Sequence, residues 1–378
     1  MRKKIVFLAK VIDSGGVSST MLELGKNLHL HNWEVYIISG GQSGKHQFSK
    51  EKFESENISY LELPFLRQEL FGLIKFPVNV FRFCKSIREI NPDIIHVHWR
   101  SVSIYAKASE VLLKIPFVST IHLNEIPHSF IHRLVSFWGE KVIVISTETA
   151  EFMTRVFHIP KSRQILIFNG VDNNKFKIPD HLEKCEARRY FKIDEGCFVI
   201  SCLARLEEVK GHKTIIEALV KLNPIFRENI IVIFGGEGSL ESRLKKEVAS
   251  VGLNRNFLFL GHADSCKVLK ASDVFILTSY KEGFPVSVVE AMFSGVPVIR
   301  TPSEGAYDQI DDAETGILVN FDDPDALKDK IELLYKDRVF LKYLKTNAFI
   351  KAKNSFTNNE MCFKTIETYF SVISNLNP

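Results

Sequence analysis

The sequence predicts an α/β protein made of two successive doubly wound domains. Short apolar, β-branched runs alternate with helical patterns, and this alternation stops once in a polar segment before it starts again. A chain of 378 residues is long enough for two to three domains. Its 45% hydrophobic and 25% charged residues are ordinary for a globular protein and argue against disorder or a coiled coil.

The first half of the chain contains the first set of strand candidates. Helical patterns such as 17–30 and 71–90 separate most of them, which is typical of βαβ units in a parallel sheet. The predicted strands are residues 5–8, 35–39, 58–63, 94–98, 117–121, 142–145 and 165–168.

The alternation stops at residues 172–195, a polar and charged segment that contains Pro179. We interpret this segment as the connection between the two domains. Because ligands of such sheets bind at the carboxyl ends of the strands, we expect a site where two such domains face each other. The strands predicted after it are residues 198–203, 230–234, 257–260, 274–277, 296–299 and 317–319.

The end of the chain is predicted to be helical, with helices at 325–335, 339–352 and 358–373. The predicted domains are therefore 1–172 and 190–355. Residues 356–378 are predicted to form a C-terminal helix that packs on the first domain.

Charge is spread unevenly along the chain. Residues 1–180 carry 23 Lys and Arg against 17 Asp and Glu, whereas the remainder carries 26 against 28. This excess is too small for a nucleic-acid-binding protein. A basic first half fits contact with anionic lipid, and scatter in surface charge is the alternative. Residues 65–90 are either an element that lies on a membrane surface or a core-packing helix.

No apolar stretch is long enough to predict a membrane-spanning helix. The apolar run after Met1 is broken at Lys10 and Asp13, so we interpret it as a strand and not as a signal peptide, and expect a cytoplasmic protein. The six cysteines form no C-x-x-C pair and are expected to be reduced thiols.

Two glycine-containing loops follow predicted strands. Gly15 and Gly16 precede the first helix, and Gly235 lies in the loop after strand 230–234. Glycines at such places let backbone N–H groups approach a phosphate, although each loop also fits a plain tight turn.

Two cations follow the first strand of the second domain. Arg205 and Lys210 lie beyond its carboxyl end, where they could neutralise a diphosphate or form a solvated surface pair.

The segment 280–291 follows the strand 274–277. Gly283 permits a tight backbone path, and Pro285 fits the first turn of a helix. Glu290 falls within the otherwise apolar helix 286–292, where a carboxylate needs a partner. A ribose diol or a buried base would supply that partner.

Three histidines belong to the first domain. His122 ends the strand 117–121 and faces the expected site, or it is a core histidine. His96 and His98 share one strand face, but no carboxylate or thiol completes a familiar zinc spacing, so no metal site is predicted. Asp323-Pro324-Asp325 is interpreted as a helix start and not as a metal-binding motif.

Several of these segments together resemble the retaining glycosyltransferases of family 4. The spacing Glu282-x7-Glu290, with Gly283-Phe284-Pro285 after the first glutamate, resembles the E-x7-E motif of that family. The order and spacing of the motifs extend the resemblance over nearly the whole chain. The other matching segments are Gly15-Gly16, residues 92–98, Asn169-Gly170-Val171-Asp172, Arg205 with Lys210-Gly211, residues 271–274 and Glu290-Ala291-Met292. The family usually has Gly-Gly-x-x-Glu where this chain has residues 304–308, with Glu304 first and Asp308 last.

The resemblance implies the GT-B fold, in which two Rossmann-like domains face a central cleft and the C-terminal helix crosses back to the N-terminal domain. It implies catalytic roles for Glu282, His122, Arg205 and Lys210. Glu290 is expected to bind the ribose, and Arg205, Lys210 and Gly16 the diphosphate. The implied donor-binding residues are Gly15, Gly16, Arg205, Lys210, Gly235, Glu282, Gly283, Phe284, Pro285, Val286, Ser287 and Glu290.

The resemblance also implies the activity. We expect a retaining hexosyltransferase that uses a nucleotide-sugar as substrate, with a UDP-sugar favoured and GDP-mannose as the second choice, and that needs no metal cofactor. The implied acceptor is a glycan or a lipid-linked glycan of surface polysaccharide or lipopolysaccharide synthesis. The protein would then lie in the cytoplasm at the inner face of the cell membrane, with peripheral contact through its first domain. A GT-B nucleotide-sugar epimerase and a non-catalytic nucleotide-sugar-binding protein are the alternatives.

Overall fold

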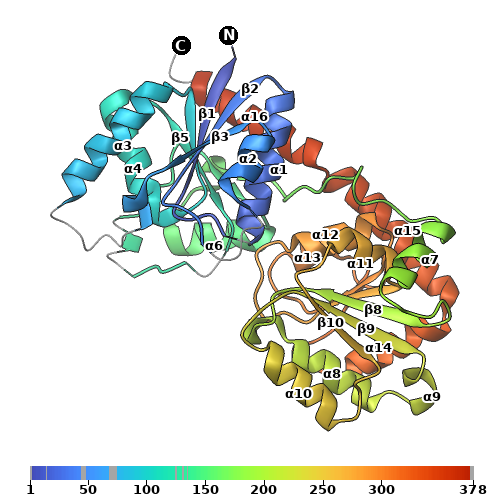
Figure 1. Ribbon diagram of the computed structural model, residues 1–378. Helices are drawn as coiled ribbons and strands as arrows, with labels where there is room; N and C mark the ends of the chain where they lie inside the picture. The colour runs from blue at the N-terminus through green and yellow to red at the C-terminus, as the bar shows by residue number, and fades with distance from the viewer. Residues whose placement is uncertain are drawn as a thin grey trace. The chain divides into compact units, whose positions relative to one another are not determined.

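The computed structural model describes residues 2–13, 15–43, 48–67, 75–123, 126–129, 132–133 and 135–374. The chain divides into two compact units, each built on one parallel sheet (Figure 1). Unit 1 contains the residues up to Gly170 together with those from Asn358 onward, and unit 2 contains Val171–Thr357.

Unit 1 is built on a seven-stranded parallel sheet of order β3-β2-β1-β4-β5-β6-β7. The strand order reverses between β1 and β4, so the chain winds outward from these two neighbours in both directions. Its strands are β1 (Lys3–Ala9), β2 (Trp33–Ser39), β3 (Ile58–Glu62), β4 (Ile94–Val97), β5 (Phe117–Ile121), β6 (Val142–Val144) and β7 (Gln164–Leu166).

Helices cover both faces of this sheet. The apolar side chains of α1, α2 and α16 pack on one face, and those of α3 and α4 pack on the other (Figure 1). The helices are α1 (Gly16–Leu30), α2 (Lys50–Ser55), α3 (Phe76–Ile90), α4 (Ser103–Leu113), α6 (Thr147–Phe157) and α16 (Asn358–Ser374), with short 3₁₀ turns η1 (Pro64–Arg67), η3 (Arg100–Val102) and η4 (Lys161–Arg163).

The last helix, α16, belongs to unit 1 although unit 2 lies between them in sequence. The Tyr369 hydroxyl is 2.6 Å from Nδ1 of the buried His96, and the Tyr369 ring packs edge-on against Trp33. Asn358 at the start of the helix donates a hydrogen bond of 2.8 Å to Glu23 in α1. These contacts attach the end of the chain to the first sheet.

Unit 2 is built on a six-stranded parallel sheet of order β10-β9-β8-β11-β12-β13. Its order reverses between β8 and β11. Its strands are β8 (Phe198–Leu203), β9 (Ile230–Gly235), β10 (Phe257–Gly261), β11 (Val274–Leu277), β12 (Val298–Arg300) and β13 (Ile317–Leu318).

The helices of unit 2 also form two layers. Helices α8, α10 and α14 pack on one face of the sheet, and α7, α11 and α12 lie on the other (Figure 1). The helices are α7 (His181–Tyr190), α8 (His212–Lys221), α9 (Pro224–Arg227), α10 (Glu241–Ser250), α11 (Ser265–Ala271), α12 (Val286–Phe293), α13 (Ala306–Gln309), α14 (Pro324–Lys336) and α15 (Arg338–Ser355), with η5 at Glu208–Lys210.

Most predicted elements are present, and the strand boundaries differ by no more than two residues. The strand predicted at 296–299 starts at Val298, because Pro297 has no N–H to donate to the ladder. The first residues of the helix predicted at 71–90 lie outside the described residues, and α3 is observed from Phe76. Asp323 caps α14 by accepting from the Ala326 N–H, so the interpretation of residues 323–325 as a helix start is confirmed.

The segment 172–195 differs from its prediction as a plain connection, because it contains helix α7. Asp180 and Glu183 form a capping box at the helix start, each side chain accepting from the other's backbone N–H. The helix buries few apolar residues, which is why hydrophobic periodicity does not reveal it. Since α7 lies in unit 2, that unit begins before the predicted boundary at 190.

An ion-pair cluster attaches α7 to the sheet of unit 2. The carboxylate of Asp273 lies 2.7 Å from Arg188 and 2.6 Å from Lys184, and it also accepts from the Val199 N–H. The side chain of Arg188 is only 7% exposed, whereas that of Lys184 is 32% exposed.

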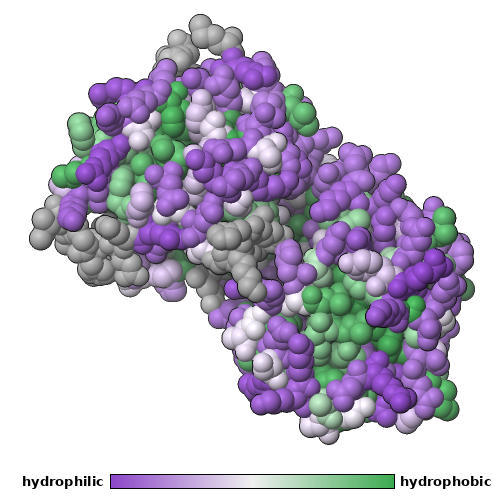
Figure 2. Space-filling model, viewed as in Figure 1, coloured by the Kyte–Doolittle hydropathy of each residue, from purple (hydrophilic) through white to green (hydrophobic). Residues whose placement is uncertain are grey.

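Two surfaces are notable for their apolar character. Figure 2 shows hydrophobic residues gathered over the β8–β10 side of unit 2, where β10 is the edge strand and Leu258, Phe259 and Leu260 are only partly covered. On α3 of unit 1, Phe83 and Ile87 face the core while Phe81 is 70% exposed. None of the described helices is both long and apolar enough to cross a membrane.

The Asp273 cluster predicts a difference between two variants. Asp273→Ala leaves the buried Arg188 guanidinium without its carboxylate and should lower the free energy of unfolding by about 3–5 kcal/mol. Lys184→Met removes only a partly exposed partner and should cost less than about 1 kcal/mol. Denaturant unfolding of both variants measures the difference, and equal losses would contradict the role given to Arg188.

Candidate functional site

The candidate site of unit 2 lies where the strand order of its sheet reverses. Strands β8 and β11 are neighbours, and the chain leaves them for opposite sides of the sheet. Because the strands are parallel, the loops that follow them emerge at the same edge, next to each other. These loops are residues 204–211 and 278–285, which contain half of the residues predicted from the sequence to bind a donor.

Lys210 and Glu282 meet at this point. The Lys210 Nζ atom lies 2.6 Å from Oε1 of Glu282, and their side chains are only 15% and 11% exposed. The structure thus brings together two predicted catalytic residues that are 72 positions apart in the chain. An ammonium group has three N–H donors, so Lys210 can bind Glu282 and an anionic ligand at the same time.

Backbone contacts join the two loops and explain the meeting. Gly211 adopts φ +64°, and a Cβ atom there would lie 2.2 Å from the Thr278 carbonyl oxygen. The Thr278 hydroxyl donates to the Gly211 carbonyl at 2.8 Å, and the Tyr280 N–H donates to the Val209 carbonyl at 2.9 Å. A side chain at position 211 would separate the loops that carry Lys210 and Glu282.

Arg205 and Gly235 lie on neighbouring loops. The Arg205 side chain is exposed. Gly235 ends β9, and a Cβ atom there would lie 2.6 Å from the Leu203 side chain. The Leu206 N–H donates to the Glu237 carbonyl at 3.0 Å, which holds the loop after β8 against the loop after β9.

Helix α12 begins at Val286, and Pro285 is its N-cap, one residue before the predicted position in the first turn. Gly283 and Phe284 are buried, and the Phe284 ring packs edge-on against Phe356. Glu290 is half-buried on α12, and Ser287 is half-buried in its first turn. The two glutamates of the E-x7-E spacing therefore lie on the loop before α12 and on the helix itself.

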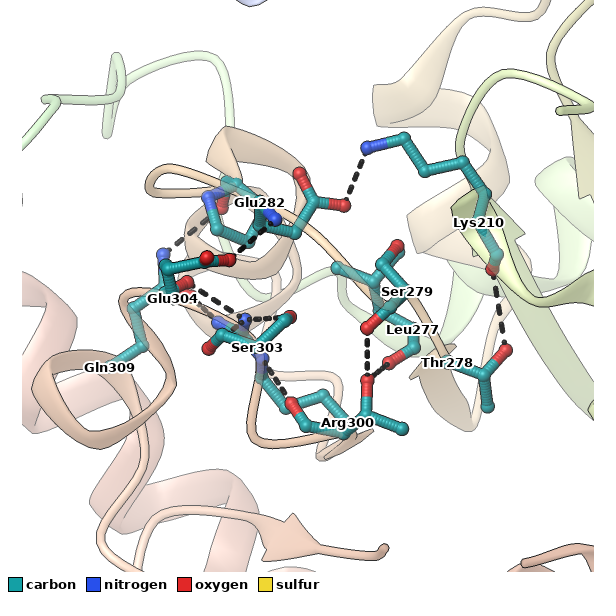
Figure 3. A network of polar contacts seen from close by, with 11 residues as sticks. Lys210, Leu277, Thr278, Ser279, Glu282, Arg300, Ser303, Glu304 and Gln309 are labelled. Atoms are coloured by element: carbon teal, nitrogen blue, oxygen red, sulfur yellow. Dashed lines mark hydrogen bonds and ion pairs between the residues drawn. The ribbon is translucent and has the colours of Figure 1, made fainter. Parts of the chain in front are cut away.

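The site also contains Glu304, which the sequence marked only as a departure from the family motif, and Arg300 and Gln309, which it did not single out. Figure 3 shows that Glu304 accepts a hydrogen bond from the Glu282 N–H at 3.0 Å, and that the buried Arg300 and Gln309 lie beside it. The signal for Arg300 was present, because an arginine directly follows an apolar run in a predicted buried strand. Such a cation needs a partner, as Glu290 does in its helix.

In unit 1, Gly15 and Gly16 follow the first strand as predicted. Gly15 is the N-cap of α1, and its N–H donates to the Asp13 carboxylate at 2.9 Å. The Ser18 hydroxyl also donates to this carboxylate, at 3.2 Å. A Cβ atom at Gly16 would meet no atom within 4 Å, so the start of α1 is sterically open to a ligand at that residue.

The three histidines of unit 1 lie together at the carboxyl ends of β4 and β5. His98 Nδ1 is 3.1 Å from His122 Nε2, and the rings of His96 and His98 lie 4.1 Å apart. The second nitrogen of His96, Nε2, lies 2.7 Å from the Thr120 hydroxyl. Burial lowers the pKa of His96 to about 3 and that of His122 to about 4, so these rings are neutral at physiological pH.

The hydrogen bonds of His96 to protein groups use both of its ring nitrogens. Within the part of the chain that the structure describes, no group of three or more His, Cys, Asp or Glu side chains could hold a metal ion.

The lowered pKa values of His96 and of the partly buried His122 predict a pH dependence of stability. Their pKa values in the folded chain lie below the ordinary value of 6.5, so between pH about 6.5 and about 4 the unfolded chain binds protons that the folded chain does not. Stability should therefore fall as the pH falls through this window. Each histidine contributes up to about 1.4 kcal/mol per pH unit.

Thermal or denaturant unfolding between pH 6.5 and 5 tests this expectation. His122→Gln removes one of these groups and should lose less stability on acidification than the wild-type protein. Comparing the change in the free energy of unfolding per pH unit between wild type and His122→Gln cancels the contribution of carboxylates elsewhere. Identical slopes would show that His122 titrates normally in the folded protein.

Two family models match the chain. The model for "Glycosyltransferase Family 4" matches residues 14–175, and the model for "Glycosyl transferases group 1" matches residues 183–351. Between them they leave unmatched only the two ends and a short segment near α7. The chain belongs to the family 4 glycosyltransferases and has their two-domain GT-B fold, which confirms the family and fold predicted from the sequence.

Individual relatives are distant but extend over most of the chain. The UDP-Gal:α-D-GlcNAc-diphosphoundecaprenol α-1,3-galactosyltransferase of Escherichia coli is 26% identical over 80% of this chain and 82% of its own. The N-acetyl-α-D-glucosaminyl L-malate synthase of Bacillus anthracis is 22% identical over 95% of this chain and 94% of its own. The structure of HepE from Anabaena in complex with UDP and glucose superimposes with a TM-score of 0.83 at 21% identity, over 98% of this chain and all of the other.

Proposed function

We propose that this glycosyltransferase moves a hexose from a nucleotide-sugar, with a UDP-sugar favoured over GDP-mannose, to a glycan or lipid-linked acceptor, with retention of configuration and without a metal ion. The observation that carries the proposal is the largely buried Lys210–Glu282 pair at the point where the sheet of unit 2 reverses its strand order. A cation and a carboxylate held together there suit a substrate with an anionic and a polar end.

The cations serve the leaving group. As the bond between the anomeric carbon and the phosphate oxygen breaks, its electron pair leaves with the nucleoside diphosphate, and the negative charge on that group grows. A cation fixed beforehand in a water-poor place stabilises such charge without reorganisation. Lys210 is held in this way by Glu282, and the exposed Arg205 on the same loop can add a second charge from solvent. Together they take the role that a metal has elsewhere.

The carboxylates serve the sugar and the ribose. Glu282 can accept from sugar hydroxyls with the oxygen lone pairs that Lys210 does not use. Glu290, half-buried on α12, can accept from the two ribose hydroxyls. In a retaining reaction the acceptor hydroxyl attacks from the face that the diphosphate leaves, and its proton passes to a phosphate oxygen.

The acceptor side is proposed for unit 1, with His122 near the sugar and the acceptor. The sterically open start of α1 at Gly16 is proposed to reach the diphosphate of the donor. The lipid-linked acceptor of the Escherichia coli relative supports an acceptor on a lipid carrier. Helix α3 suits peripheral contact at the inner face of the cell membrane, because it exposes the apolar Val78 and Phe81 together with the basic Arg82. The malate synthase shows that a relative of this chain has a small acceptor, which is the alternative.

The proposed function predicts which nucleotide-sugar the protein binds. Because the nucleotide binds the folded protein, a UDP-sugar should raise the melting temperature and be hydrolysed slowly in the absence of acceptor, whereas an ADP-sugar at the same concentration should do neither. A screen of UDP-, GDP- and ADP-sugars by thermal shift and by release of the nucleoside diphosphate measures both effects.

Three controls separate the alternatives. Unchanged turnover in EDTA is expected, and recovery of a lost activity by Mg²⁺ would overturn the metal-independent mechanism. An epimerase would alter the sugar without an acceptor, which product analysis by NMR detects, and the same spectra report the anomeric configuration of a transferred sugar. Binding of a nucleotide-sugar without any turnover would indicate a non-catalytic nucleotide-sugar-binding protein.

The proposed function also predicts the effect of removing either member of the buried Lys210–Glu282 pair. Lys210→Met removes the fixed cation and Glu282→Gln removes the carboxylate while keeping a hydrogen-bond acceptor for Lys210. Each should lower kcat by about 100-fold or more, the size of effect expected when one group that stabilises transition-state charge is lost. Initial rates with the donor found by the screen measure it.

The neighbouring exposed pair of Lys213 and Glu217 on α8 provides the matched control. Glu217→Gln should change kcat by less than about twofold, since surface pairs contribute little. Wild-type turnover in Glu282→Gln would remove that residue from the mechanism.

A further inference from the structure

Arg300 is a fully buried cation at the carboxyl end of β12. Its side chain is 0% exposed and is the largest of the fully buried side chains among the described residues. Strands β11 and β13 flank it on either side, with Leu277 and Leu318 as its register partners. A guanidinium group taken out of water in this way must have its N–H donors satisfied by the surrounding protein.

The guanidinium group donates to the loop that follows it (Figure 3). Its Nη2 atom donates to the Ser303 hydroxyl at 3.0 Å and to the carbonyl oxygens of Ser303 and Glu304, both at 3.2 Å. Its Nη1 atom donates to the side-chain oxygen of Gln309. Because guanidinium is planar and its donors have fixed directions, these bonds define the positions of both acceptor segments.

Gln309 transmits this contact to the start of α12. It is fully buried, and its Nε2 atom donates to the Pro285 carbonyl oxygen at 3.0 Å. Only one orientation of the amide is compatible with its neighbours, since the reverse orientation would place two N–H donors against each other at Arg300 and two oxygens against each other at Pro285.

The Pro285 carbonyl fixes the direction of the next N–H. The trans peptide between Pro285 and Val286 is planar, so the N–H of Val286 points opposite to the carbonyl that Gln309 holds. Val286 is the first residue of α12, and N–H groups in a first turn have no acceptor within their own helix. The Val286 N–H therefore points to the side opposite Gln309, and an anion can bind the N–H on that side.

A second branch from Arg300 reaches Glu282. The Glu304 carbonyl accepts from Arg300, while the Glu304 carboxylate accepts from the Glu282 N–H at 3.0 Å. The loop between these two contacts approaches closely, since a Cβ atom at Gly305 would lie 2.8 Å from the Gly283 carbonyl. The loop that precedes α12 is thus held at both ends, at Glu282 and at Pro285, by groups that lead to Arg300.

We propose that Arg300 and Gln309 are positioning residues of the donor site: through the Pro285 carbonyl and Glu304 they orient the Val286 N–H and Glu282 toward the phosphate and sugar of the nucleotide-sugar. This role rests on the proposed function, because it presupposes that α12 receives the donor. The two residues do not touch the substrate. They set the geometry of groups that do.

The variant Gln309→Glu isolates this role. It keeps the size of the side chain and its bond with Arg300, but a carboxylate beside a guanidinium group stays ionised and cannot donate to the Pro285 carbonyl. If the Val286 N–H stabilises the leaving phosphate, whose charge grows in the transition state, the loss should appear in kcat. We expect kcat to fall by about 10- to 100-fold while KM for the donor changes by less than about threefold.

The matched control is Asp273→Asn, which weakens the α7 cluster at the amino end of β11, the opposite edge of the sheet from Glu282. It should lower the melting temperature but leave kcat within about twofold of wild type. Gln309→Met, which loses both hydrogen bonds but fills the same space, should reproduce the kcat loss of Gln309→Glu. Wild-type kcat in both Gln309 variants, or an equal loss in Asp273→Asn, would overturn the proposal.

Amide hydrogen exchange supplies a readout that needs no donor. Peptides that span residues 282–290 should exchange faster in Gln309→Glu than in Asp273→Asn, in both cases without nucleotide. If the wild-type protein turns over no nucleotide-sugar, the proposed function fails, and this comparison still decides whether Arg300 and Gln309 hold the loop. Unchanged exchange at 282–290 would show that they do not.

Discussion

The arrangement of this protein depends on one constraint, the parallel alignment of every strand in both sheets. Parallel strands send all their following loops to the same edge, and reversal of the strand order brings two of these loops together. In unit 2 the reversal lies between β8 and β11, and it brings Lys210 and Glu282 to within 2.6 Å although 72 positions separate them. In unit 1 the neighbouring strands β4 and β5 also send their following loops to one edge, which brings His98 and His122 together without a reversal of strand order.

Buried charge is the second constraint, and unit 2 satisfies it in three different ways. Asp273 holds Arg188 and Lys184 at the amino end of β11, where the cluster attaches a helix to the sheet. Lys210 and Glu282 neutralise each other at the carboxyl end. Arg300 donates to an amide oxygen and to backbone carbonyls, so its burial orders the loops around it. A charge that must be solvated by protein thereby becomes a means of fixing backbone positions.

Much of this could be predicted from the sequence because the relevant signals are local. Apolar runs located the strands, and the Glu282–Glu290 spacing with its neighbouring motifs predicted the family that the comparisons show. Helix α7 was missed because it buries little apolar surface, although its Asp180–Glu183 capping box is a local signal that could have revealed it. Gln309 was missed because nothing in its local sequence distinguishes it. Arg300 carried a signal, a cation directly after a predicted buried strand, but its contact with Gln309 depends on the tertiary structure.

Local sequence patterns were therefore sufficient to predict the α/β class, the two-domain organisation, the family, and the polar residues of α12 and of the loop before it. The partners of these side chains follow only from the folded arrangement: Lys210 contacts Glu282, Gln309 contacts both Arg300 and Pro285, and His96 contacts Tyr369 of the last helix. The physical reason is that secondary structure follows from periodicity within a few residues. A contact between distant segments depends instead on strand order, register and side-chain packing, which no local pattern encodes.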